Sequence, residues 1–220
     1  METPLNKVDG ETVNLSPSLT VNFAEAKVTL PLIVIFLFVL LCNSAHFALY
    51  FNEMTHDNKF KMDGKGEDMF FLSNGHVSAL WYSVLARSGY FSTEELGTFR
   101  KLNSRLQGHP ATHEGLPGIR IASGSLGQGL SVAIGVAQAK KIDKDDKLVY
   151  VMMGDGEQQE GQVWEAGMYA AHHKVDNLIA AIDYNGQQID GPTAKIMDLK
   201  NLKAKIPVEK AGGGLVSWGN

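Results

Sequence analysis

The chain reads LVYVMMGDGE at residues 148–157 and LIAAIDYN at residues 178–185, and these two runs decide the fold. The first is an apolar run that ends in an acidic turn, and the second ends on Asn185, 30 residues after Asp155. That separation suits a strand–helix–strand unit, whose right-handed crossover sets its two strands parallel. We therefore predict an α/β fold with an open, mostly parallel sheet flanked by helices.

Two polar side chains follow the predicted strands. Asp155 and Asn185 would lie close together at the edge where open α/β sheets bind ligands. A carboxylate and an amide oxygen suit Mg²⁺, and Gly154 and Gly156 would let the backbone approach a phosphate. These residues therefore suggest Mg²⁺ carrying a diphosphate. The alternative for Asp155 is a plain turn, because Asp-Gly pairs commonly close loops.

This arrangement resembles the thiamine diphosphate motif, which opens with Gly-Asp-Gly and closes on Asn after a similar interval. Other stretches resemble transketolase motifs, in the same order and at comparable intervals. They are Ser73-Asn74-Gly75-His76, Gln107-Gly108-His109-Pro110, Ser123-Gly124-Ser125-Leu126-Gly127-Gln128-Gly129 and Gln159-Glu160-Gly161. The resemblance covers roughly residues 47–205 and identifies the chain as the N-terminal, diphosphate-binding half of a transketolase, in a split form encoded as a separate subunit. It implies the thiamine diphosphate-binding fold, incomplete at both ends.

The resemblance also implies which residues hold the metal and the cofactor. Asp155, Asn185 and the backbone carbonyl of Gln187 would bind Mg²⁺, or Ca²⁺ or Mn²⁺ in its place. Asp155 and Asn185 would thereby also hold the cofactor. Its further contacts are implied at His76, Gly124, Ser125, Leu126, Gly154, Gly156 and Glu157.

Three side chains resemble residues with a part in catalysis. His76 and His109 match active-site histidines near the diphosphate and the donor sugar, a task that suits a side chain able to donate, accept and titrate near neutrality. Glu160 matches a glutamate at the dimer interface that is linked to the paired active site. A surface or structural role is the alternative for each histidine, and complementing a helix dipole is the alternative for Glu160.

The implied activity is transfer of a two-carbon ketol unit from a ketose phosphate to an aldose phosphate, with thiamine diphosphate supplying the difficult chemistry. The glutamate that assists the aminopyrimidine ring lies in the family's second domain, and nothing in this sequence matches that domain. We therefore expect the chain to be inactive alone. It would need a C-terminal transketolase subunit or domain, within a homo- or hetero-oligomer.

Apolar periodicity outlines the other elements between residues 47 and 205. Residues 69–72 are a predicted strand, and helical spacing predicts a helix over residues 76–88 that ends at Gly89. A capping box at residues 92–95 predicts a short helix to about residue 102. The remaining predicted elements are helices over residues 125–141 and 160–173, and strands over residues 148–153 and 178–184.

Composition narrows the class of protein. A length of 220 residues, 44% of them hydrophobic, supports one sizeable domain with its own core. The net charge of −4 argues against nucleic acid as the main partner and leaves a sugar phosphate open. The single cysteine, Cys42, rules out an internal disulfide and fits a cytoplasmic protein.

The two ends of the chain depart from the family pattern. Residues 1–46 form a tail with an apolar segment at 30–42, and residues 206–220 form a second tail. A membrane-spanning helix needs about 20 apolar residues, so the segment is short. The long acidic and polar sequence before it does not resemble the short basic start of a signal peptide. We therefore expect neither, although a membrane anchor stays an alternative.

Other thiamine diphosphate enzymes share the Gly-Asp-Gly and Asn unit, among them the α-subunit of 2-oxo acid dehydrogenases and deoxyxylulose phosphate synthase. The stretches at residues 73–76, 107–110 and 124–129 favour transketolase over both. An inactive, truncated or misread transketolase fragment is a further alternative. A nicotinamide-binding fold is disfavoured, because no Gly-x-Gly-x-x-Gly follows a strand.

Overall fold

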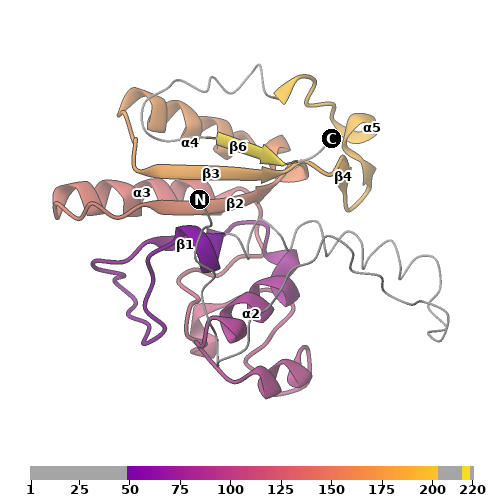
Figure 1. Cartoon of the computed structure of the whole chain (residues 1–220). Coiled ribbons are helices and arrows are strands. Elements are labelled where there is room, and N and C mark those ends of the chain that lie inside the picture. The colour runs from indigo at the N-terminus through magenta and orange to yellow at the C-terminus, as the bar shows by residue number, and fades with distance from the viewer. Residues whose placement is uncertain (1–48, 203–214, 219–220) are drawn as a thin grey trace, which may run out of the picture. The chain divides into compact units, whose positions relative to one another are not determined.

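Four parallel strands form the sheet of the computed structural model, which describes residues 49–202 and 215–218. They run side by side in the order β1-β2-β3-β6 (Figure 1). Their bounds are β1 (Met69–Leu72), β2 (Val149–Gly154), β3 (Leu178–Asp183) and β6 (Leu215–Trp218). The predicted open parallel α/β sheet is confirmed.

The strand–helix–strand unit is present as predicted. Helix α4 (Gly161–His172) connects β2 to β3, and the two strands pair in parallel from Val149 opposite Leu178 to Gly154 opposite Asp183. Parallel pairing in this register brings the carboxyl ends of both strands to one edge. The turn after β2 and the loop after β3 therefore leave the sheet together.

Both faces of the sheet are covered by helices. Side chains of a strand point alternately to opposite faces, so β1 gives Phe70 and Leu72 to one core and Met69 and Phe71 to the other. Helix α2 (Ser78–Arg87) packs in the first core, below the sheet in Figure 1. Helices α3 (Gln128–Ile142) and α4 contribute to the second. Burial on both faces explains the apolar runs of the strands.

Two predicted helices differ from those in the structure. Helix α3 begins at Gln128 and not at residue 125, because Gly127 has a left-handed backbone with φ 85° and ends the glycine-rich turn before it. The helix expected up to residue 102 is a short 3₁₀ helix, Thr93–Thr98. Glu95 does not close the predicted capping box, since its carboxylate binds Arg105.

Short elements complete the described part of the chain. Strands β4 (Gln187–Gln188) and β5 (Gly191–Pro192) form a small antiparallel ladder after β3, and α5 (Thr193–Ile196) follows them. The others are a π-helix at Leu49–Glu53 and 3₁₀ helices at Gly75–Val77, Thr112–Glu114 and Gly156–Gln159.

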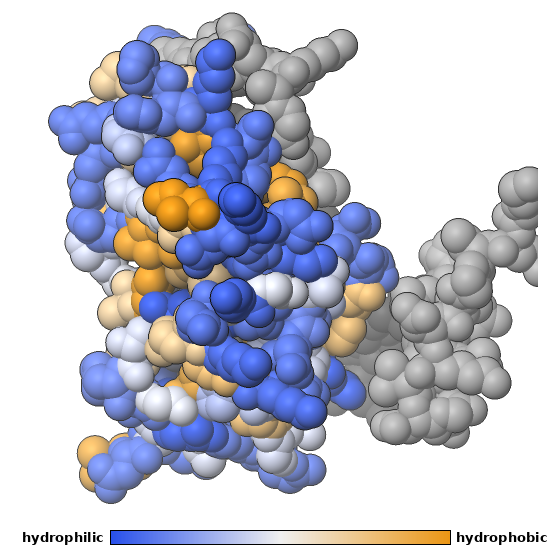
Figure 2. Space-filling view, turned by 90° about the vertical axis from the view of Figure 1, so that its left-hand side faces the viewer, coloured by the Kyte–Doolittle hydropathy of each residue, from blue (hydrophilic) through white to orange (hydrophobic). Residues whose placement is uncertain are grey.

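The structure describes only part of the two tails. The apolar segment 30–42 and the rest of residues 1–48 lie outside the described residues, as do residues 203–214. Residues 215–218 form β6 beside β3, where the sequence predicted no strand. No described helix is long and apolar enough to cross a membrane. The side of the molecule where the strands begin is largely hydrophilic, with a few small apolar patches (Figure 2).

A buried ion pair fastens α3 to the loop before β1. The Lys140 ammonium donates hydrogen bonds to the carbonyls of Gly64 and Glu67, at 3.0 and 2.9 Å, and to the Asp145 carboxylate at 2.8 Å. Burial disfavours the ionised form of Asp145, but hydrogen bonds from Lys140 and from two backbone amides outweigh it and lower the pKa of this carboxyl to about 2. The pair therefore remains charged at neutral pH.

We expect the substitution Asp145→Asn to lower the free energy of unfolding at pH 7 by about 3 kcal/mol, because it leaves the Lys140 charge buried without its counter-ion. The depressed pKa means that this stabilisation is present near neutrality and is lost as the pH falls toward about 2. Urea unfolding measures the difference. Asp146→Asn, an exposed neighbour, is the control and should change stability by less than about 0.5 kcal/mol. Equal stability of both variants at pH 7 would contradict the role given to the pair.

Candidate functional site

Loops from five parts of the chain meet at the carboxyl edge of the sheet. Gly75, after β1, packs so closely on the Ser123 carbonyl that a methyl group there would overlap it, which explains the glycine. A Cβ atom at Gly124 would lie 3.5 Å from the His109 ring. A Cβ atom at Gly154 would lie 3.8 Å from the Asn74 Cβ. The stretches at residues 73–76, 107–110 and 123–129 and the turn at Gly154 therefore lie together.

Asp155 is the most deeply buried acid of this site, with 0% of its surface exposed. Its carboxylate accepts hydrogen bonds from the Gly156 amide at 2.9 Å and from the Gly186 amide at 2.7 Å. Gly186 lies between Asn185 and Gln187, the two other expected metal ligands. The structure thus brings the loop that carries them within hydrogen-bond reach of Asp155.

The loop of residues 185–188 packs directly on the turn that follows β2. A Cβ atom at Gly156 would lie 2.7 Å from the Gln188 Cβ and 3.6 Å from the Gln187 carbonyl oxygen. The Asn185 side chain is oriented by two hydrogen bonds: its Oδ1 accepts from the Gln187 amide at 2.8 Å, and its Nδ2 donates to Asp183 at 3.1 Å. Amide and carboxylate oxygens can accept further contacts, so both keep capacity for a cation.

The charge of Asp155 has no basic partner, since no described lysine, arginine or histidine forms an ion pair with it. Burial holds the pKa of Asp155 above its ordinary value; the Gly186 and Gly156 amides oppose this shift, and the nearby Asp183 adds to it. A bound divalent cation would compensate such a buried carboxylate. No cluster of three or more His, Cys, Asp or Glu side chains capable of holding a metal occurs among residues 49–202. A site of this kind therefore needs carbonyl, amide and ligand oxygens, as Mg²⁺ with a diphosphate provides.

One buried acceptor near Asp155 was not singled out from the sequence. Asn74 is 1% exposed, and its Oδ1 has no hydrogen-bond partner in the described structure. Buried acceptors are nearly always satisfied, so this atom indicates a missing donor, such as a water on a bound cation. The motif Ser73-Asn74-Gly75-His76 pointed to this loop, but nothing in it marked the amide. Together, Asp155, the loop of Asn185 and Gln187, and Asn74 fit a cation that carries a diphosphate.

Glu157, expected at the cofactor, directs its carboxylate to donors of the chain itself. One oxygen accepts from the Ser73 hydroxyl and from the Gly127 amide at 2.6 Å, and the other accepts from the Gly154 amide at 3.1 Å. Burial raises the pKa of this carboxyl above its ordinary value, and the three hydrogen bonds oppose that shift without cancelling it. Ser73 is a second residue that the sequence did not assign a role.

The two histidines lie on the open side of the site. His76, in the 3₁₀ helix Gly75–Val77, and His109 are both exposed. The surrounding protein partly desolvates the His76 ring and lowers its pKa; the Asp183 carboxylate opposes this shift, and His109 adds to it. His76 is therefore uncharged at neutral pH and can both donate and accept a hydrogen bond.

The other expected residues lie at the rim of the site. Gly124 and Ser125 are exposed, and Leu126 is half-buried just before α3. Glu160 is exposed at the first position before α4, where its side chain makes no capping hydrogen bond. Its place at the amino-terminal end of α4 leaves both expectations open, the dimer interface and complementing the helix dipole.

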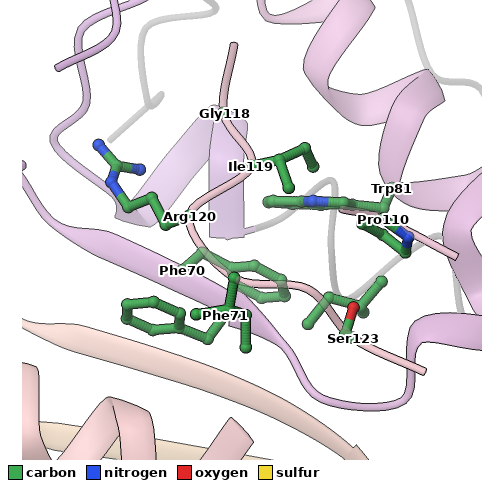
Figure 3. A pocket seen from close by; sticks show the side chains of 10 residues that line it. Phe70, Phe71, Trp81, Pro110, Gly118, Ile119, Arg120 and Ser123 are labelled. Atoms are coloured by element: carbon green, nitrogen blue, oxygen red, sulfur yellow. The ribbon is translucent and has the colours of Figure 1, made fainter. Parts of the chain in front are cut away.

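A small cavity lies between β1 and the loops that carry Pro110 and Ser123. It measures about 10 Å³ and is enclosed by Phe70, Trp81, Ile119, Arg120 and neighbouring side chains (Figure 3). That volume suits one water molecule at most, so the cavity cannot hold a substrate. The open carboxyl edge of the sheet is the candidate site.

Comparison with known proteins gives these residues a family context. The family described as "Transketolase, thiamine diphosphate binding domain" matches residues 41–205. One subunit of the apulose-4-phosphate transketolase of Phocaeicola vulgatus is 42% identical over 162 residues, which are 74% of this chain and 57% of that protein. The transketolase of Homo sapiens is 39% identical over 163 residues, covering 72% of this chain and 26% of that protein.

Solved structures give the same result. A transketolase variant from Pichia stipitis superimposes with a TM-score of 0.67 at 35% identity, over 76% of this chain and 25% of that one. The transketolase of Leishmania mexicana gives 0.66 at 33% identity, over 72% and 25%. The chain therefore spans about half the length of the Phocaeicola vulgatus protein and about a quarter of the longer transketolases.

We expect His76 to titrate below the ordinary value of 6.5, because the surrounding loops disfavour its charged form. Nuclear magnetic resonance of the imidazole protons as a function of pH measures the midpoint. His76→Gln removes one resonance and so assigns it. A midpoint at or above 6.5 would show that Asp183 outweighs desolvation, and that His76 is substantially charged near neutrality.

Proposed function

This chain belongs to the transketolase family, in which it matches the thiamine diphosphate binding domain, and we propose that it holds thiamine diphosphate and a divalent cation for ketol transfer. The reaction would move a two-carbon unit from a ketose phosphate to an aldose phosphate. The observation that carries this proposal is the buried Asp155 carboxylate, which has no basic partner among the described residues and lies within hydrogen-bond distance of the loop of Asn185 and Gln187.

Each part of the site has a proposed task. The Asp155 carboxylate, the Asn185 side-chain oxygen and the Gln187 carbonyl would hold Mg²⁺, or Ca²⁺ or Mn²⁺. When bound, thiamine diphosphate supplies the nucleophilic carbon and the electron sink for ketol transfer. The residues proposed to line it are His76, Gly124, Ser125, Leu126, Gly154 and Gly156, with Glu157 supporting them.

His76 and His109 would form hydrogen bonds with the donor sugar. Both are exposed at the same edge as Asp155, and an uncharged imidazole can donate to a carbonyl or accept from a hydroxyl. The two histidines would orient the donor sugar and relay its protons.

A partner chain would complete the enzyme. The relative from Phocaeicola vulgatus is itself named as one subunit of its transketolase, and this chain covers 57% of it. We infer that a C-terminal transketolase chain or domain supplies the pyrimidine-binding half, within a dimer or larger oligomer in which Glu160 lies at the interface. The relatives are transketolases, which favours ketol transfer over the oxidative decarboxylation of 2-oxo acid dehydrogenases. We propose a cytoplasmic location and a role in pentose phosphate metabolism.

We expect Asp155→Ala to abolish Mg²⁺-dependent binding of thiamine diphosphate, because it removes the only full negative charge proposed at the cation. Isothermal titration calorimetry, with and without Mg²⁺, measures the affinity. Asp190→Ala, an exposed acid of the same loop region, is the matched control and should bind as the unchanged chain does. An affinity of the Asp155 variant equal to that of the control would remove the metal assignment.

We expect His109→Ala to lower the turnover of a sugar phosphate by about 10²–10⁴-fold while weakening cofactor binding far less, since proton transfer and orientation would be lost. Glycolaldehyde transfer is measured with a C-terminal transketolase chain present. His113→Ala, an exposed histidine outside the quoted motifs, serves as the control. Unchanged turnover in the His109 variant would refute its role.

A further inference from the structure

The amino-terminal end of α3 is occupied by a carboxylate from elsewhere in the chain. Helix α3 begins at Gln128 without a capping side chain of its own. Glu157 accepts a hydrogen bond from the Gly127 amide at 2.6 Å, and the Ser73 hydroxyl accepts one from the Gly129 amide at 3.1 Å. Ser73 in turn donates to Glu157. Two side chains from other loops therefore satisfy amides that a helix leaves free.

The second oxygen of Glu157 extends this link to the sheet. It accepts from the amide of Gly154, the last residue of β2 and the neighbour of Asp155, at 3.1 Å. One carboxylate thus joins the loop after β1, the turn before α3 and the end of β2. Those three segments carry His76, Ser125 with Leu126, and Asp155 respectively.

The environment of Glu157 suits a fixed negative charge. The side chain is 1% exposed, and no lysine or arginine pairs with it in the part of the chain that is described. Three hydrogen bonds and the positive end of the α3 dipole offset part of the cost of burying an ionised carboxylate there. A helix amino terminus otherwise attracts phosphate groups. The Glu157 carboxylate therefore occupies the position at the amino terminus of α3 that a phosphate group could otherwise take.

We propose that Glu157 is a positioning residue, which holds the turn before α3 and the turn after β2 at a fixed separation and keeps the helix end from binding the diphosphate. The inference rests on the proposed function. The diphosphate would then depend on the cation at Asp155 and not on the α3 dipole. Glu157 would not touch the cofactor.

The substitution Glu157→Gln tests this at nearly constant volume. An amide replaces one of the two acceptor oxygens with a donor, so at least one of the Gly127 and Gly154 amides loses its acceptor. The two turns should separate. In the full chain, we expect faster hydrogen exchange at both glycine amides and an affinity for thiamine diphosphate, with Mg²⁺ present, weakened by about 10–100-fold.

Two further variants separate positioning from stability. Glu165→Gln removes an exposed glutamate of α4 and should keep the original affinity. Asp145→Asn destabilises the chain through the Lys140 pair, away from the loops that Glu157 joins, and should also keep it. All affinities are measured by calorimetry at a temperature where circular dichroism shows each variant folded. Should the Glu157 variant not fold, Ser73→Ala removes one donor and leaves the charge, and should give a smaller loss of affinity.

Three results would overturn the inference. Equal affinity of the unchanged chain and the Glu157 variant would leave Glu157 a purely structural role. An equal loss in the Asp145 variant would attribute the effect to stability. A crystal structure with the Glu157 carboxylate hydrogen-bonded to thiamine diphosphate would make it a direct ligand. If the unchanged chain does not bind thiamine diphosphate with Mg²⁺ even when a C-terminal transketolase chain is present, the cofactor assignment itself fails, and this inference falls with it.

Discussion

The hydrogen bond from the Gly186 amide to the Asp155 carboxylate is the contact on which the site depends. It joins the turn after β2 to the loop after β3, and it exists because a parallel crossover brings the ends of both strands to one edge. An antiparallel pair would send these two ends to opposite edges. The parallel direction of β3 is therefore required to bring the site residues together, whatever their side chains are.

Two buried acids of this domain, Asp145 and Asp155, differ in what balances their negative charge. Asp145 lies against the Lys140 ammonium, so its charge is balanced within the fold. Asp155 is more deeply buried and receives only backbone amides. A charge without a counter-ion is costly in a folded protein, and it persists where a ligand supplies the balance. Glu157 is also buried without a basic partner among the described residues, so what marks the site is the position of Asp155 beside the loop of Asn185 and Gln187.

The sequence was sufficient for strands β1, β2 and β3 and for the parallel pairing of β2 with β3, because buried parallel strands are apolar runs and a crossover helix makes its two strands parallel. It was insufficient where glycine decides local structure: Gly127 delays the start of α3, although the apolar spacing continued before it. The link made by Glu157 was also beyond reach, since Ser73 lies 84 residues away along the chain. Strand β6 was missed because residues 215–218 carry no pattern distinct from a tail.

The burial of the site is graded, from Asp155 and Asn74 beneath the surface to His76, His109 and Ser125 in contact with solvent. A ligand bound at the buried end of the site, near Asp155, would expose its other, reactive end to bulk water. Solvent protons would then quench a reactive carbon before a sugar arrived. A partner protein that covers this edge would exclude water and so protect the reactive carbon from protonation, in addition to contributing its own side chains.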